Sequence, residues 1–269
     1  MSRPTPRPLV VAIAVALVAL AGVLAAARWG WLGPDVGRGG EFCEADSGTW
    51  IRQPVSTWSN LGFVIAGLVV AVHARRRVGL GLTMGARPVL ATAYAVLVVL
   101  LGPASMAMHA TGTAVGGAID QWSMFLLAGF AATYAVLRVV RAGPWFLFVA
   151  FPLAVAWAEG VRSHRLPAPP VDVVGNDGNA AFGVLLAVTL VGELLVAVLH
   201  GRRSRQDVAF GAAAVLAFAG SFGVWGLGQV GKDSCDPHSL WQWHGVWHVG
   251  CALAAYLLFR HYTGERARD

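Results

Sequence analysis

Long apolar runs, separated by short polar segments, dominate the chain. Each run is about 20 residues long, which is the length that an α-helix needs to cross the hydrocarbon core of a bilayer. The runs lack the alternation over about ten residues that marks a membrane β-strand. Because lipid offers no partners for backbone polar groups, we expect the runs to be helices. The pattern predicts an all-α membrane bundle with eight spans, at residues 9–27, 55–73, 88–110, 117–137, 144–161, 178–199, 207–230 and 242–259.

Composition supports a multi-pass membrane protein. Of the 269 residues, 57% are hydrophobic and 13% are charged, against about 45–50% and about 25% in soluble domains. These values exclude a soluble enzyme and a disordered tail. Arginine supplies all but one of the 20 basic residues. Together with the many alanines, glycines and valines, this usage favours a bacterial protein, and we expect it in the inner membrane.

Basic residues are spread unequally between the two sets of loops that eight spans create. Fourteen of the 20 lie on the side that holds both termini, and six lie on the other side. Because cytoplasmic loops carry an excess of Lys and Arg, both termini are predicted to be cytoplasmic. The net charge of +6 is therefore a topology signal. The chain has no groove of interleaved arginines and aromatic residues, so no nucleic-acid partner is expected.

The first span has two interpretations. Residues 1–30 carry two early arginines, an apolar run and three alanines that end at Ala27, which fits an extra N-terminal transmembrane helix or a signal peptide. The length of the run favours a retained helix. Both interpretations place the loop 28–54 outside the cytoplasm. The other seven spans, within residues 41–262, are predicted to form one helical domain.

Ionisable residues at membrane depth gather on the outer side of the predicted bundle. His109 lies at the outer end of one span, Asp120 opens the next, and His244 and His248 begin the last. A charge at the centre of a membrane helix costs about 2.5–3.5 kcal/mol, so such residues are functional candidates. The glycine-containing turn at 111–113 returns Asp120 to the depth of His109.

Helical spacing groups these residues further, because positions four apart share one face of a helix. Ser105 and His109 have this spacing, and so do His244 and His248. Three imidazoles from two helices are the ligand set of a catalytic zinc ion, which keeps a fourth position open for water. Asp120 could accept the proton of that water, and Ser105 could donate to a developing oxyanion.

Other interpretations of the histidines stay open. A pair of histidines at spacing four arises by chance about 0.2 times in a chain of this composition, so the pair alone is weak evidence. A membrane histidine often serves only as a hydrogen-bonding group between helices, and paired membrane histidines also ligate haem. Three further histidines at cytoplasmic helix ends are expected to be interfacial: His73, His200 and His261.

The spaced residues resemble the alkaline ceramidase family, whose members are seven-helix intramembrane amidases related to the adiponectin receptors. The likeness rests on the string from Ser105 to His109, on Asp120, and on the pair His244 and His248 in the last span. The outer-loop strings at 42–44 and 56–61 extend the likeness to residues 41–260, and the first span has no counterpart. The resemblance implies that the three histidines bind zinc, that Asp120 acts on the zinc water and that Ser105 supports the oxyanion.

The resemblance also implies a calcium ion bound by the outer loop beside the zinc. Glu41, Glu44 and Asp46 supply oxygen ligands at the matching places. Gln53 stands where the family usually has a glutamate, and the stretch between Asp46 and Gln53 is shorter. The alternative is an acidic loop that is simply solvated.

Two cysteines lie in loops placed outside the cytoplasm, where disulfides persist. A bridge between Cys43 and Cys235 is expected and is also implied by the resemblance, whereas Cys251 lies within the last span. Such a bridge would tie the outer loop to the approach of the last span. The alternative is two unpaired thiols.

The predicted function is hydrolysis of the amide bond of a ceramide or a similar N-acyl membrane lipid, giving a fatty acid and an amine. The lipid would reach the site laterally from the membrane. Within the enzyme class, the alternative substrate is an ester or another bacterial N-acyl lipid. Outside it, a receptor or sensor with a structural zinc ion and a haem-binding electron carrier are the alternatives.

Overall fold

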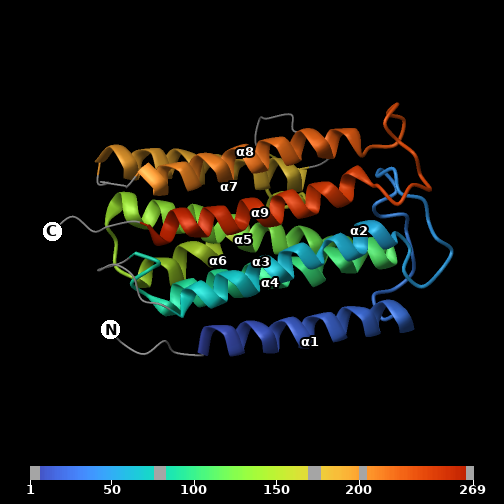
Figure 1. The fold of residues 1–269 in the computed structure, drawn as a ribbon, viewed down its shortest axis with the longest axis horizontal. Helices are drawn as coiled ribbons and strands as arrows, with labels where there is room; N and C mark the ends of the chain where they lie inside the picture. Colours follow the sequence, from blue (N-terminus) through green and yellow to red (C-terminus); the bar gives the residue numbers. More distant parts are fainter. Residues whose placement is uncertain (1–6, 76–82, 169–176, 200–204, 265–269) are drawn as a thin grey trace.

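A computed structural model describes residues 7–75, 83–168, 177–199 and 205–264. In this part of the chain, helices account for all the extended regular structure and form an elongated bundle (Figure 1). The predicted all-α membrane fold is confirmed. The helices are α1 (Arg7–Trp29), α2 (Pro54–Ser59), α3 (Leu61–Ala74), α4 (Pro88–Thr111), α5 (Ala114–Val140), α6 (Trp145–Arg162), α7 (Asp177–Leu199), α8 (Arg205–Leu227) and α9 (Trp243–Thr263).

All eight predicted spans have counterparts in the structure. Seven segments are long and apolar enough to cross a membrane, and α9 is the eighth, with 21 residues and a less apolar sequence. The second span differs from the prediction, because it is divided at Asn60 into the short α2 and the longer α3. The side-chain amide of Asn60 donates to the carbonyl oxygen of Ser56 at 2.8 Å, which accompanies this break.

Helix α4 is central, since it packs against α1, α3 and α5, while α9 packs against α8 and α3. Helix α7 packs against α5 and α6, and the described residues of α7 and α8 scarcely contact each other. The start of α1 and the end of α9 lie at the same end of the bundle (Figure 1). Which end faces the cytoplasm remains a prediction from the loop charges. Residues that this prediction used and that lie outside the described part are Arg3, Arg76, Arg77, Arg202, Arg203, Arg266 and Arg268, and His200 lies outside it too.

A buried ion network lies towards this end, which we call the inner end. The Glu193 carboxylate on α7 accepts from Arg138 on α5 and lies 3.2 Å from the Nε2 atom of His261 on α9. The Arg138 guanidinium also covers the rings of Tyr134 and Tyr262. His261 is thus buried between helices rather than interfacial, because Glu193 provides an intramembrane partner.

Close approach of α3 and α4 depends on a residue without a side chain. A Cβ atom at Gly67 would lie 2.5 Å from the Val99 Cγ2 atom and 2.8 Å from the Ala95 carbonyl oxygen. Small residues allow this kind of backbone contact between membrane helices. The crossing holds α4, and with it the outer end of that helix, in place.

We expect Gly67→Ala to lower the free energy of unfolding by about 1–3 kcal/mol, because the added methyl group overpacks this crossing. Gly183→Ala on α7 is the matched control, since a Cβ atom there meets nothing within 4 Å. The control should leave stability unchanged or raise it by about 0.5–1 kcal/mol. Denaturant unfolding in detergent measures both variants, and equal effects would contradict the packing argument.

Candidate metal centre

A tight turn joins α4 to α5 and sets the depth of both helices. Gly112 adopts a left-handed conformation with φ of 62° after the last turn of α4. Thr113 then caps α5, its hydroxyl oxygen accepting from the Gly116 N–H at 2.9 Å. A Cβ atom at Gly116 would lie 2.6 Å from the Ala107 carbonyl oxygen, so α5 begins directly against α4. The turn thereby returns Asp120 to the last turns of α4, as the sequence predicted.

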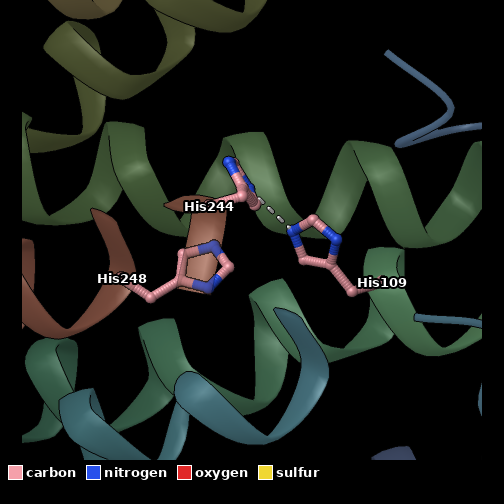
Figure 2. Close-up of side chains that lie close together, drawn as sticks. All are labelled: His109, His244 and His248. Carbon is pink, nitrogen blue, oxygen red and sulfur yellow. Dashed lines mark hydrogen bonds between the residues drawn. The ribbon is translucent and has the colours of Figure 1, made fainter. Parts of the chain in front are cut away.

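Three imidazole rings meet at the outer end of the bundle. His109 comes from the last turns of α4, and His244 and His248 come from the first two turns of α9 (Figure 2). The ring of His109 lies 4.9 Å from that of His244 and 5.0 Å from that of His248, between centroids. All three residues are at most 4% exposed, so water does not solvate their nitrogen atoms freely.

The spacing of the ring nitrogens suits one shared metal ion. The Nε2 atoms of His109 and His244 are 3.2 Å apart. Two nitrogens bound tetrahedrally at about 2.0–2.1 Å would be about 3.3–3.4 Å apart. One nitrogen from each of the three histidines lies within 4.8 Å of the others, and the described residues contain no other group of three metal-ligating side chains this close. The donor set of three neutral nitrogens fits a zinc ion.

A hydrogen bond from His109 to Gln53 orients the imidazole ring. The Gln53 side-chain NH₂ donates to the carbonyl oxygens of Gly39 at 2.9 Å and Glu44 at 3.0 Å, which fixes the direction of the amide. Its Oε1 atom lies 2.8 Å from the Nδ1 atom of His109. Because an amide oxygen only accepts, the proton of His109 is on Nδ1, and Nε2 keeps a lone pair for a metal.

The other two histidines are held differently. The Nδ1 atom of His248 lies 2.8 Å from the hydroxyl of Ser59, which turns its Nε2 atom inward. The Phe42 ring stacks on His244 with centroids 3.5 Å apart. The Nδ1 atom of His244 is buried without a hydrogen-bond partner in the described structure.

Ser105 and Asp120 form a pair beside the histidines. The Ser105 side chain lies close enough to the Asp120 carboxylate to interact with it. Ser105 lies one helical turn before His109 on α4, and both members of the pair are at most 9% exposed. Glu41 lies near enough for its charge to act on Asp120. The structure therefore brings the predicted serine and aspartate together next to the predicted ligands.

The residues expected to bind calcium are not brought together. The two carboxylate oxygens of Glu44 accept from the N–H groups of Val55 at 2.6 Å and Ser56 at 2.7 Å, so this side chain caps α2. Glu41 is exposed, and its carbonyl oxygen accepts from Val230. Gln53 is occupied by His109 and two carbonyl groups, as described above.

Asp46, the fourth residue of that set, forms a separate contact. It accepts from the Gly48 N–H at 2.8 Å and pairs with Arg52 at 2.9 Å. The Gly48 N–H and the Arg52 guanidinium hold the pKa of Asp46 below its ordinary value. These contacts stabilise the loop, because the Gly48 N–H group and Arg52 meet the Asp46 carboxylate.

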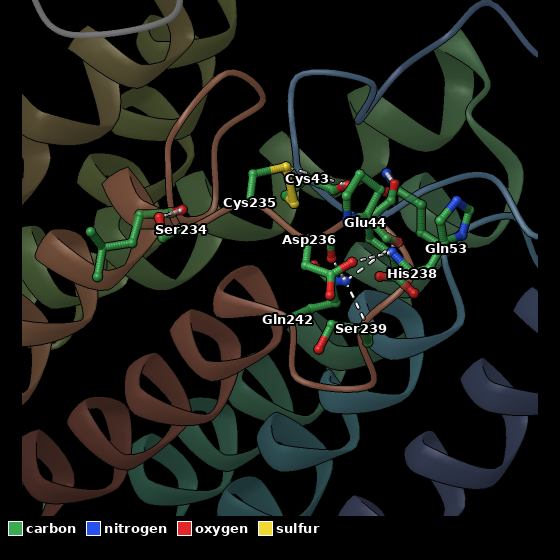
Figure 3. The surroundings of a disulfide bond; sticks show 11 residues. Cys43, Glu44, Gln53, Ser234, Cys235, Asp236, His238, Ser239 and Gln242 are labelled. Atoms are coloured by element: carbon green, nitrogen blue, oxygen red, sulfur yellow. Dashed lines mark hydrogen bonds between the residues drawn. A yellow bond between two sulfur atoms is a disulfide. The ribbon is translucent and has the colours of Figure 1, made fainter.

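The expected disulfide between Cys43 and Cys235 is present, with Cα atoms 5.4 Å apart (Figure 3). The Cys43 N–H also donates to the Gly228 carbonyl oxygen at 2.8 Å. On the Cys235 side of the disulfide, the Gln242 amide donates to carbonyl groups of the loop before α9, including that of Asp236 at 3.0 Å. The bridge thus fixes Phe42, the neighbour of Cys43, against the start of α9.

Sequence reasoning missed the supporting contacts of Gln53, Phe42 and Ser59. Gln53 contacts His109 on α4, and Phe42 contacts His244 on α9. Both residues lie in the loop far before these helices, so helical periodicity does not relate them to the histidines. Ser59 belongs to an outer-loop string that was noted only for its likeness to a family. Their roles become visible only when α2 is packed beside α4 and α9.

Comparison of the chain with models of known protein families gives no match, and neither does comparison with curated proteins.

Replacing His244 by Ala should abolish metal binding, because two imidazoles in a buried site leave the ion under-coordinated. We expect the metal content of the purified protein to fall from about one ion per chain to near zero, as measured by elemental analysis. His238→Ala is the control, since His238 is exposed in the loop before α9 and is not one of the three. Full metal retention in His244→Ala would contradict the shared site.

Substitution of Gly39 tests the support of His109 by Gln53. Gly39 has φ of +80°, and an added Cβ atom would lie 2.9 Å from the Gln53 Oε1 atom. Gly39→Ala should therefore displace Gln53 and weaken zinc affinity about 10–100-fold, as is usual for groups that orient metal ligands.

Gly37→Ala provides the control for backbone strain. Its φ is +79°, but a Cβ atom there meets nothing within 4 Å. Competition with a zinc chelator measures both variants. If both lose affinity equally, the effect comes from loop strain and not from Gln53.

Proposed function

We propose that this protein is a zinc-dependent intramembrane hydrolase that cleaves the N-acyl bond of a ceramide or a ceramide-like lipid. The observation that carries the proposal is the buried three-histidine cluster, with Ser105 one helical turn before His109 and with Asp120 close to Ser105. Zinc sites with three protein ligands leave a position for water, which is the arrangement of zinc hydrolases. The site would face the outer leaflet of a bacterial inner membrane, with both termini in the cytoplasm.

His109, His244 and His248 would hold the ion through their inward nitrogens. A zinc ion there would supply hydroxide at neutral pH, because it lowers the pKa of water from 15.7 to about 7. The burial of the three rings supports this use, since a water-poor site strengthens the interaction between a cation and a developing negative charge.

Asp120 and Ser105 would carry out the proton transfer and the orientation. Asp120 would take the proton that the attacking water loses and deliver it to the amine as the C–N bond breaks. The amine leaves as a neutral group, and the acyl part leaves as a fatty acid. The Ser105 hydroxyl would orient the carboxylate of Asp120 in the resting site, and it would turn its single proton to the carbonyl oxygen as that atom becomes negative.

A chain of aromatic rings supports lateral access from the membrane. Phe222 on α8 is 46% exposed and stacks on Trp225 with centroids 5.6 Å apart. Trp225 meets Phe42 at 6.5 Å, and Phe42 covers His244. An acyl chain would lie along this row of rings on α8. The rings would then guide it from lipid to the histidines.

Replacing Asp120 by Asn should separate metal binding from catalysis. We expect zinc content to stay at the wild-type level, while fatty-acid release from N-acyl lipids falls about 10²–10⁴-fold, because the general base is lost. The release is measured by mass spectrometry on purified protein with a panel of ceramides, other N-acyl lipids and ester lipids. Asp233→Asn, at an exposed position in the loop after α8, is the control.

The panel also distinguishes the competing functions. Release only from ester lipids would replace the amidase by an esterase at the same site. If zinc-loaded wild-type protein hydrolyses no lipid of the panel, the result would contradict the enzyme proposal and favour a receptor or sensor with structural zinc. Normal turnover in Asp120→Asn would remove that residue from the mechanism.

A further inference from the structure

A second polar site lies at the inner end of the bundle, far along the helices from the histidines. A cavity of about 230 Å³ opens between the end of α3, the start of α8 and the end of α9. His73 and Arg260 supply its basic groups, and Phe210 and Phe259 supply apolar walls. The loop charges assign this end to the cytoplasm, where anionic lipids attract basic residues.

Arg260 presents unused donors to this cavity. Its Nη1 atom donates to the Tyr256 hydroxyl at 2.9 Å, and its guanidinium carbon lies 4.4 Å from the centroid of the Phe210 ring. The other guanidinium nitrogens of Arg260 have no acceptor in the described part of the chain. The aromatic contacts fix the plane of the guanidinium, so its free edge is oriented for an anion.

His73 lies next to this arginine on the neighbouring helix. Its Nδ1 atom donates to the Val69 carbonyl oxygen at 2.9 Å, because a carbonyl oxygen only accepts. The other ring nitrogen, Nε2, is therefore left to face outward from an exposed side chain. The rings of His73 and Tyr256 are 5.8 Å apart, so the two basic residues share one rim of the cavity.

An exposed apolar seam runs from these basic groups along the two helices. Ile65 and Val69 share the face of His73 on α3 and are 62% and 37% exposed. Val249 and Leu253 share the face of Arg260 on α9 and are 54% and 51% exposed. Helices α3 and α9 pack against each other, so the two apolar faces adjoin. The apolar seam is complementary to acyl chains, and the basic rim is complementary to an anionic headgroup.

We propose that the seam between α3 and α9 binds one anionic phospholipid of the cytoplasmic leaflet. Its phosphate would bond to Arg260 and His73, and an acyl chain would lie over Ile65, Val69 and the facing residues of α9. Charge-assisted bonds from a guanidinium to phosphate are among the strong hydrogen bonds. Asp207 also lines the cavity, on the α8 wall with its carboxylate against Gly264. That negative charge disfavours a free phosphate deep in the cavity and favours a headgroup held at the rim.

Native mass spectrometry of the full chain in neutral detergent tests the proposal. The probes are phosphatidylglycerol and phosphatidylcholine with the same acyl chains, titrated separately. We expect one phosphatidylglycerol per chain to bind at least tenfold more tightly than phosphatidylcholine. Arg260→Gln and His73→Gln should each reduce this preference by about tenfold, while Arg28→Gln, an exposed arginine at the outer end of α1, should leave it unchanged.

The outcomes are distinct from those that test the hydrolase. Equal binding of the two lipids would overturn the site, as would an unchanged preference in both variants. If inorganic phosphate displaces phosphatidylglycerol at equal concentration, the site binds a free anion rather than a lipid. That result also overturns the proposal. Thermal unfolding checks that Arg260→Gln folds; if it does not, His73→Gln decides, because that side chain is exposed. Zinc content should stay at the wild-type level in all three variants.

Discussion

The convergence of three buried imidazoles on one point is the constraint on which the outer half of the protein depends. Each ring must direct a nitrogen inward, so each needs a partner behind it or pays for a buried polar atom without one. Gln53 meets this need for His109, and Ser59 meets it for His248. Both partner residues come from the outer loop and α2, so the orientation of these two rings depends on the folded loop.

The outer loop is held by peptide groups and side chains where a cation had been expected. The Glu44 carboxylate satisfies the first N–H groups of α2, which have no partners within the helix itself. The Gln53 amide joins two loop carbonyl groups and His109 at once. An amide NH₂ group donates hydrogen bonds, so Gln53 satisfies both carbonyl oxygens where a carboxylate could not. The disulfide closes the same loop covalently onto the approach to α9.

Span positions and the three ligands could be predicted from sequence because both follow local rules. Membrane helices need a certain length of apolar chain, and residues four apart share a face, so His244 and His248 had to point the same way. The break at Asn60 and the roles of Gln53 and Glu44 could not be predicted. A carboxylate such as Glu44 can ligate a metal or cap a helix, and only the position of the next N–H groups decides between them. His261 shows the same limit, since its burial depends on Glu193 from another helix.

The two ends of the bundle bury polar side chains in opposite ways, and the contrast separates a structural cluster from a ligand site. At the inner end, Glu193 meets Arg138 and His261, so donors face an acceptor and the network satisfies itself. At the outer end, His109 and His244 turn like nitrogens towards each other at 3.2 Å. Two nitrogen lone pairs repel each other. A single proton shared between them would form a hydrogen bond between two of the three rings and would leave the third without one. An electron-pair acceptor at the centre would satisfy all three rings at once, so the outer cluster has the geometry to hold a metal ion, whereas the inner network pairs its own charges.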